Sequence, residues 1–198
     1  MARTIARLFN THEEALAAID DLEKIGVPHS HVSLISNNSE SWYDNYAARG
    51  AGKGAAVGGL IGGGASILAS LSMLAVPGFG PVLVAGWLAS TVAGATLGAM
   101  TGGLLGVVKE ATETEEEAQI FAEGVRRGGT LVSVRTDLAH AGQVEEILNR
   151  HGSVDAASRG MEYRERGWDG FDETAPAYSR EDIAEERSRY IGGERPAR

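Results

Sequence analysis

The groups in this chain that could do chemistry are two closely spaced histidines and a run of acids. His29 and His31 stand two residues apart, but a metal site needs at least a third ligand and the sequence offers none nearby. Glu113 and the acids at 115–117 favour the first turn of a helix through its dipole, which explains them without a bound cation. We therefore expect no metal site, no cofactor and no catalytic residue.

Other classes of site are disfavoured by composition and by the absence of motifs. The chain has no cysteine, which excludes a thiol nucleophile and a zinc–thiolate site. Its formal charge of −9 argues against binding of nucleic acid, which needs clustered cations. The glycines are spaced by four and lack a Gly-Lys-Ser/Thr ending, so they do not form a phosphate loop. No serine–histidine–acid order has the context of a nucleophile elbow.

The longest uncharged stretch runs from Gly54 to Val108 and also lacks His, Asn and Gln. It breaks once, at a turn made of Pro77, Gly78, Phe79, Gly80 and Pro81. Each half on either side of this turn exceeds the roughly 20 apolar residues that a membrane-spanning helix needs. The stretch therefore predicts a helical hairpin over 54–108, with the lipid bilayer as its partner.

Small residues recur at every fourth position of this hairpin, which places them on one face of each helix. Such a face lets two backbones approach closely, as in helix association inside membranes. This pattern predicts a glycine zipper that joins copies of the chain into a homo-oligomer. The expected helix-packing residues are Gly54, Gly58, Gly62, Ser66, Gly94, Gly98, Gly102 and Gly106.

The charges that flank the hairpin predict its orientation. Arg49, Lys53 and Lys109 lie at the same end, and the uncharged turn lies at the other. The positive-inside rule then places both termini in the cytoplasm and the protein in the inner membrane. The alternative is a cytoplasmic protein whose hairpins are buried between subunits of a soluble assembly.

The segments on either side of the hairpin have the pattern of a charged α/β domain. Residues 1–36 predict strand, helix and strand, with a capping box formed by Thr11 and Glu14. Residues 37–53 are a polar linker, in which Trp42 would suit a membrane interface. Residues 113–158 predict helix, strand, helix and a last strand at 153–158.

The second half of the domain opens on another capping box, formed by Thr114 and Glu117. The order of elements, βαβ followed after the hairpin by αβαβ, fits a ferredoxin-like α/β sandwich of the α+β class. The hairpin interrupts this sandwich, and a C-terminal tail follows it.

The tail, residues 159–198, has too few aliphatic residues to form a core of its own. We expect it to be mobile or to lie on another surface. It is either a solvated tail or a docking segment for a protein partner, in which Trp168 and Phe171 would be the anchors.

Three segments of the chain resemble the general stress protein 17M-like family, also described as heat- or low-temperature-induced stress proteins. They are residues 8–26, the turn at 76–82, and residues 115–134, which include Glu123-Gly124-Val125-Arg126-Arg127-Gly128-Gly129. The resemblance covers about residues 3–155 and leaves the tail unexplained. It implies a bacterial stress-response protein with no established chemistry and no catalytic residues.

Taken together, these patterns favour a non-enzymatic membrane protein of the stress response that self-associates through its hairpin. Two alternatives come from other classes: a soluble homo-oligomeric assembly protein, and a ligand-sensing regulatory module. The sensing alternative rests on an analogy between folds, because no motif identifies a ligand pocket.

Overall fold

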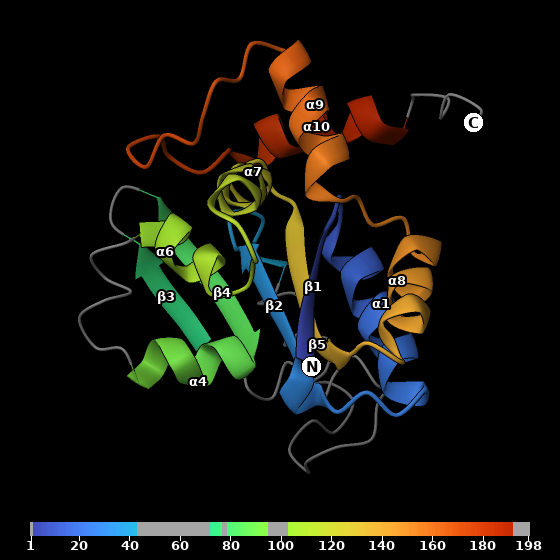
Figure 1. Ribbon diagram of the computed structural model, residues 1–198. Coiled ribbons are helices and arrows are strands. Elements are labelled where there is room, and N and C mark those ends of the chain that lie inside the picture. Colours follow the sequence, from blue (N-terminus) through green and yellow to red (C-terminus); the bar gives the residue numbers. More distant parts are fainter. Residues whose placement is uncertain (1, 43–71, 77–78, 95–102, 192–198) are drawn as a thin grey trace, which may run out of the picture.

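The computed structural model describes residues 2–42, 72–76, 79–94 and 103–191. In these ranges a five-stranded sheet has the order β1-β5-β2-β4-β3, and every neighbouring pair is antiparallel (Figure 1). The strands are β1 (Ala2–Phe9), β2 (Val32–Asn37), β3 (Ser72–Val76), β4 (Gly80–Gly86) and β5 (Thr130–Asp137). Helices cover the sheet, so the chain has the α+β architecture that the sequence predicts.

The first three elements form a split βαβ unit. Helix α1 (His12–Lys24) and the 3₁₀-helix η1 (His29–His31) connect β1 to β2, and β5 lies between these two strands. The capping box at the start of α1 is confirmed: Thr11 Oγ1 accepts from the Glu14 N–H, and a Glu14 carboxylate oxygen accepts from the Thr11 N–H, both at 3.2 Å.

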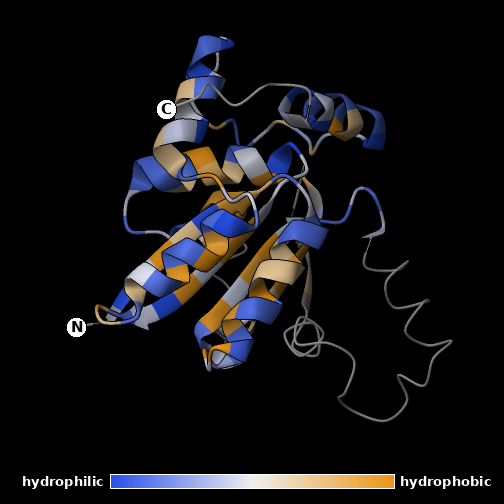
Figure 2. Cartoon of the chain, turned by 90° about the vertical axis from the view of Figure 1, so that its right-hand side faces the viewer, coloured by the Kyte–Doolittle hydropathy of each residue, from blue (hydrophilic) through white to orange (hydrophobic). Residues whose placement is uncertain are grey.

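Helices α1 and α8 (Ala141–Arg150) pack on one face of the sheet. Their apolar sides face the strands, as the hydropathy colouring shows (Figure 2). The core between them is built from alternate residues of the strands, among them Ile5, Val32, Leu34, Val132 and Val134. This alternation follows from the two-residue period of a strand.

Three other helices cover the opposite face: α4 (Trp87–Gly94), α6 (Gly103–Lys109) and α7 (Glu115–Arg126). The second capping box is confirmed at the start of α7, where Thr114 and Glu117 exchange side-chain hydrogen bonds. Phe121 of α7 and Leu104 of α6 pack with the remaining strand residues, which include Leu8. Both faces of the sheet are therefore buried.

The helical hairpin expected over 54–108 is wrong for the residues at its centre. Residues 72–76 and 80–86 form strands β3 and β4, and the Pro-Gly turn connects strands instead of helices. Strand β4 pairs with β2 from Ser33↔Gly86 to Asn37↔Val82, which satisfies the backbone of β2 on its second side. A short apolar run bounded by Gly and Pro fits a buried strand as well as a helix.

The last predicted strand is reduced to a single bridge between Val154 and Leu8, with N···O distances of 2.9 and 2.8 Å. The strand expected over 153–158 is wrong, because the Asp155 carboxylate accepts from the Ser158 N–H at 2.7 Å and starts a helix. This helix, α9 (Ala156–Glu165), and the later α10 (Arg180–Ile191) lie next to α7 (Figure 1).

Candidate functional site

Six of the eight predicted helix-packing residues, 54, 58, 62, 66, 98 and 102, lie outside the described residues. The other two do not come together as a zipper. Gly94 is the last residue of α4. Gly106 lies in α6, where an added Cβ would meet no atom within 4 Å, so no close backbone approach requires a glycine there. Gly94 and Gly106 therefore lie in two separate helices, and the rest of the glycine pattern stays a prediction.

The predicted turn is described only in part, and His29 and His31, for which no metal site was expected, lie apart from it. Pro77 and Gly78 lie outside the described residues, Phe79 is buried in the core, and Gly80 and Pro81 begin β4. His29 and His31 are exposed in η1. In the described ranges, no group of three or more His, Asp or Glu side chains could hold a metal ion.

The tail folds back onto its own chain. Trp168 and Phe171 pack against the core cluster that includes Phe121, and the Trp168 ring contacts the Tyr163 ring edge-on at 5.8 Å. The Tyr178 N–H donates to the carbonyl of Arg126 at 3.0 Å. Both predicted anchors thus meet a surface of the same molecule.

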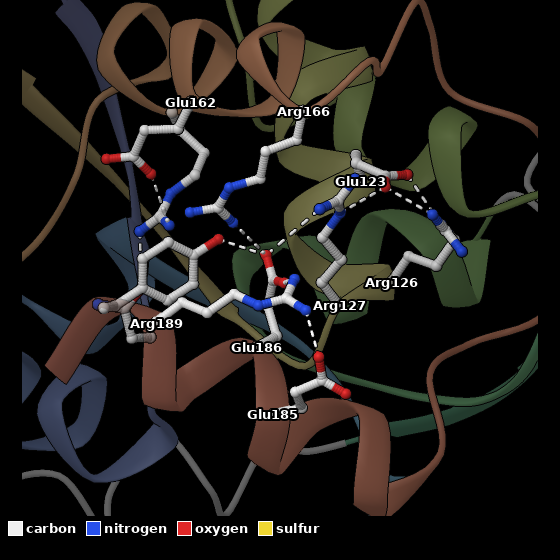
Figure 3. A network of polar contacts seen from close by, with 11 residues as sticks. Glu123, Arg126, Arg127, Glu162, Arg166, Glu185, Glu186 and Arg189 are labelled. Atoms are coloured by element: carbon white, nitrogen blue, oxygen red, sulfur yellow. Dashed lines mark hydrogen bonds and ion pairs between the residues drawn. The ribbon is translucent and has the colours of Figure 1, made fainter. Parts of the chain in front are cut away.

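A cluster of charged and aromatic side chains joins α7 to this tail (Figure 3). Its first centre is Glu123 of α7, whose side chain is only 1% exposed. Both carboxylate oxygens accept from Arg126, at 2.5 and 2.8 Å, and one also accepts from Arg127 Nε at 2.6 Å. The spacing of three and four residues places these partners on one side of the helix.

The second centre is Glu186 of α10, which is 3% exposed. Its Oε1 accepts from Arg127 and Arg166, each at 3.3 Å, and from the Tyr190 hydroxyl at 2.5 Å. Its Oε2 pairs with Arg189 Nη1 at 2.9 Å. Arg127 therefore connects the two buried carboxylates, and with them α7 and α10.

Arg159 of α9 is a third buried ion, 1% exposed. Its Nη2 donates to Asn10 Oδ1 at 2.6 Å, its Nη1 lies 3.1 Å from Glu162, and its guanidinium stacks over the Tyr190 ring at 4.0 Å. On the other side of the cluster, Arg127 stacks over the Tyr163 ring at 4.2 Å. Stacking of this kind is typical of guanidinium groups, which are planar and weakly hydrated.

The pKa values of Tyr163, Tyr190 and Arg127 are all raised, which keeps these three groups protonated near neutral pH. Burial raises the pKa of the Tyr163 and Tyr190 hydroxyls, so both stay protonated. Burial alone would lower the pKa of Arg127, but Glu123 outweighs it and the pKa is raised. A general acid or base works best with a pKa near the operating pH. The shifts of Tyr163, Tyr190 and Arg127 therefore move these three groups away from the pKa range that suits proton transfer near neutral pH.

The space enclosed by the cluster is small. A pocket bounded by Asn10, Arg127, Arg159, Tyr163 and Glu186 has room of about 10 Å³, which is the size of one water molecule. An organic substrate needs a cavity of several hundred Å³. The pocket at the cluster thus cannot hold a substrate while α10 is in place.

Helix α10 also holds the residues that follow β2. Arg187 donates to the carbonyls of Asn10 and Gly128 at 3.0 and 3.2 Å and pairs with Glu40 at 2.7 Å. Trp42, which the sequence placed in a polar linker, is buried and stacks on His12 with ring centroids 4.5 Å apart. Its indole N–H donates to the carbonyl of Asn37 at 3.2 Å.

Comparison with protein-family models, curated proteins and solved structures finds no match. In the part of the chain that the structure describes, no helix is long and apolar enough to cross a membrane.

Sequence reasoning missed the buried ionic cluster. The signal was present as acid–arginine spacings of three and four residues, Glu123 with Arg126 and Arg127, and Glu186 with Arg189. Such spacings are usual on solvated helix faces, where each pair contributes little. These groups are recognised as buried only from contacts between distant segments, such as that between Arg127 and Glu186, which are 59 residues apart in sequence.

Acidification is expected to weaken the docking of α10. Burial by itself would raise the pKa of Glu186, but the Tyr190 hydrogen bond and the Arg127 charge outweigh it, so the pKa lies below its ordinary 4.5. A lowered pKa gives stability that is complete above the unfolded-state value and is lost as the pH falls through the folded-state value. Urea unfolding between about pH 6 and pH 3 should show a steeper loss of unfolding free energy in the wild type than in Glu186→Gln. Equal pH dependence of both would contradict this role for Glu186.

Proposed function

We propose that this chain is a non-enzymatic stress-response protein that self-associates through its glycine-rich segment and carries an α/β module. The proposal rests on the position of the first row of glycines between two strands of one sheet. Strand β2 ends at Asn37 before this row, and strand β3 of the same sheet begins at Ser72 after it. Gly54, Gly58 and Gly62 belong to this row, at a spacing that favours packing between helices.

The finer fold assignment that we propose for the module is a ferredoxin-like sandwich. The split βαβ unit supports it, because β5 lies between β1 and β2 and α8 then leads to the bridge at Val154. On this assignment, residues 38–129 are an insertion that adds two strands and covers the second face with helices.

A non-enzymatic role is supported by the character of the buried polar groups. Each centre of the cluster is a carboxylate saturated by arginine and tyrosine donors, with no nucleophile paired to a base. An ionic cluster of this kind is typical of docking between elements. The resemblance to the stress-protein family agrees with this proposal, since that family has no established chemistry.

The length of the insertion favours self-association over a hairpin that crosses the bilayer. Two spans need roughly 40 residues, more than lie between Trp42 and Ser72. A single span would separate β2 from β3 and β4, which belong to the same sheet.

A membrane hairpin over 54–108, with both termini cytoplasmic, is the second candidate. The uncharged composition of the stretch and the flanking cations favour it. It requires β3, β4 and α6 to leave the sheet, which would expose the side chains of Val82, Val84 and Leu104 that are now buried. Self-association of the first glycine row needs no such rearrangement.

The substitution Gly58→Leu tests the proposal, because it adds a bulky side chain to the proposed packing face. Ala56→Leu is the matched control: it adds a similar side chain two positions away, on another side of a helix. Gly58→Leu is expected to weaken self-association at least about tenfold, or about 1.4 kcal/mol, whereas Ala56→Leu leaves it unchanged. Sedimentation equilibrium over a range of concentrations measures both.

Fractionation of host cells that express the wild type and the two variants distinguishes the self-associating assembly from the membrane hairpin. Retention in the membrane pellet after a carbonate wash would favour the hairpin, and recovery without detergent as an oligomer would favour the assembly. A strictly monomeric wild type, or equal association of the wild type and Gly58→Leu, would contradict the proposal.

A further inference from the structure

We infer that α10 is an exchangeable ligand of a helix-binding surface, and that α10 of a second copy of this chain can occupy the same surface. We call this the receptor surface. It is formed by described residues that α10 contacts, which include Asn10, Glu40, Arg127, Gly128, Arg159 and Arg166. The inference goes beyond the glycine-rich segment, because none of these residues belongs to it.

Few contacts hold α10 in place. Among residues 180–190 of α10, only Ile183 and Glu186 are buried, and Ile183 supplies the buried aliphatic side chain of this range. Its side chain packs against the backbone of Gly128, where an added Cβ would lie 2.6 Å from Ile183. A helix of this length is only marginally stable by itself in water, so its order depends on these few contacts.

The other described contacts of α10 are ion pairs, hydrogen bonds from Arg187 to backbone carbonyls, and the stacking of Arg159 on Tyr190. A buried ionic contact contributes little net stability. The attraction between Glu186 and the guanidinium groups of Arg127 and Arg166 is offset by the loss of water around each charge. The contacts do provide specificity, because one carboxylate oxygen of Glu186 accepts from both Arg127 and Arg166, and a helix without a carboxylate at this point would lose both bonds. Helix α10 is therefore held selectively and weakly.

Charge and shape define what the receptor surface binds. It presents two guanidinium groups to the carboxylate, the Arg159 guanidinium to an aromatic ring, and the Gly128 backbone to an aliphatic side chain. The matching ligand is a helix with an aliphatic residue, a carboxylate three residues later and a tyrosine four residues after that. In α10 these are Ile183, Glu186 and Tyr190.

The chain that leads to α10 can supply this helix to a second molecule. Residues 166–179 contain no helix or strand, and Asp172, Glu173 and Thr174 in their middle are exposed. All strands of the described sheet precede this connection, so leaving the receptor surface breaks no strand pairing. Exchange of an identical element between two copies needs no new interface, since the same contacts form in trans.

The test uses the full-length chain and a fluorescent peptide of residues 178–191. Ile183→Asp in the chain removes the aliphatic anchor of its own helix and should release α10, seen as faster amide hydrogen exchange over 180–191. The peptide is then expected to bind the Ile183→Asp chain at least tenfold more tightly than the wild-type chain, by fluorescence anisotropy. A chain with Glu181→Gln, a change at an exposed position of α10, should bind the peptide as the wild type does.

Two further measurements test whether Ile183 and the charged groups mediate binding of the peptide. A peptide that itself carries Ile183→Asp should not bind the released chain, and 0.5 M salt should weaken binding of the unmodified peptide. Slow exchange over 180–191 in the Ile183→Asp chain would show that other contacts hold α10. Release of α10 without peptide binding would show that the surface accepts no helix in trans. Neither result depends on Gly58, so the inference and the proposed function fail separately.

Discussion

Replacement of Gly86 by alanine is expected to lower the free energy of unfolding by about 2–5 kcal/mol. Gly86 ends β4 with φ of +77°, and an added Cβ would lie 1.9 Å from the carbonyl oxygen of Val32. A left-handed backbone costs an alanine about 1–2 kcal/mol, and relief of the clash requires β2 and β4 to move apart. Both effects act on the same strand pair, which continues the sheet beyond β2.

Gly106→Ala is the matched control for this prediction. Gly106 lies in α6, where an added Cβ would meet no atom within 4 Å. In a helix, alanine is favoured over glycine by up to about 1 kcal/mol, so this variant should be as stable as the wild type or more stable. Urea unfolding followed by circular dichroism measures both variants. Equal stability of Gly86→Ala and the wild type would contradict the pairing of β2 with β4.

Replacement of Glu123 by alanine is expected to cost about 3–5 kcal/mol, because it removes one partner of a buried ionic group. Arg126 and Arg127, whose side chains are 15% and 11% exposed, would lose their shared carboxylate. Arg127 also binds Glu186, so the loss should reach the docking of α10 as well as α7. We expect a lower unfolding free energy and faster amide exchange over 180–191.

Glu116→Ala provides the control on the same helix. Glu116 is 70% exposed and pairs with Arg164 at the surface. Removal of a surface pair and of one first-turn acid should cost less than about 1 kcal/mol. Similar losses for Glu116→Ala and Glu123→Ala would show that the buried cluster contributes no more to stability than a surface pair.

The difference in burial between Glu123 and Glu116 shows the limit of local sequence patterns. Both lie in α7 and both pair with an arginine, Glu123 with Arg126 of the same helix and Glu116 with Arg164, which is 48 residues away in sequence. Sequence reasoning took the acids at 115–117 correctly as first-turn residues of a helix, with Thr114 and Glu117 as its cap. It gave no reason to treat Glu123 differently, because its burial comes from segments far along the chain.

The same limit explains the error in the apolar stretch. From Gly54 to Val108 the sequence has the length, the glycine spacing and the apolar composition of two helices. Residues 80–86 instead form a strand, because β2 offers a row of unpaired backbone groups next to them. An apolar run between turn residues is compatible with either structure, and the neighbouring strand supplies the hydrogen bonds that select one.

The tail lies on a surface of its own chain, which agrees with one of the two alternatives that the sequence left open. It has too few aliphatic residues for a core of its own, yet it needs none, because Trp168 and Phe171 add to an existing core. The sequence singled out these two aromatic residues as anchors, but it did not indicate that the surface they contact belongs to the same chain. Whether they also contact another protein stays a prediction.

By itself, the sequence determined the features that depend on neighbours within about four residues. These are the two capping boxes, the helices α1, α7 and α8, and the α+β class. Such features follow from hydrogen bonds and side-chain periodicity within one element. Tertiary structure alone decided that residues 72–76 and 80–86 join the sheet and that Glu123, Glu186 and Arg159 are buried together. Strand pairing and burial of charge depend on partners many residues away, and no local pattern names those partners.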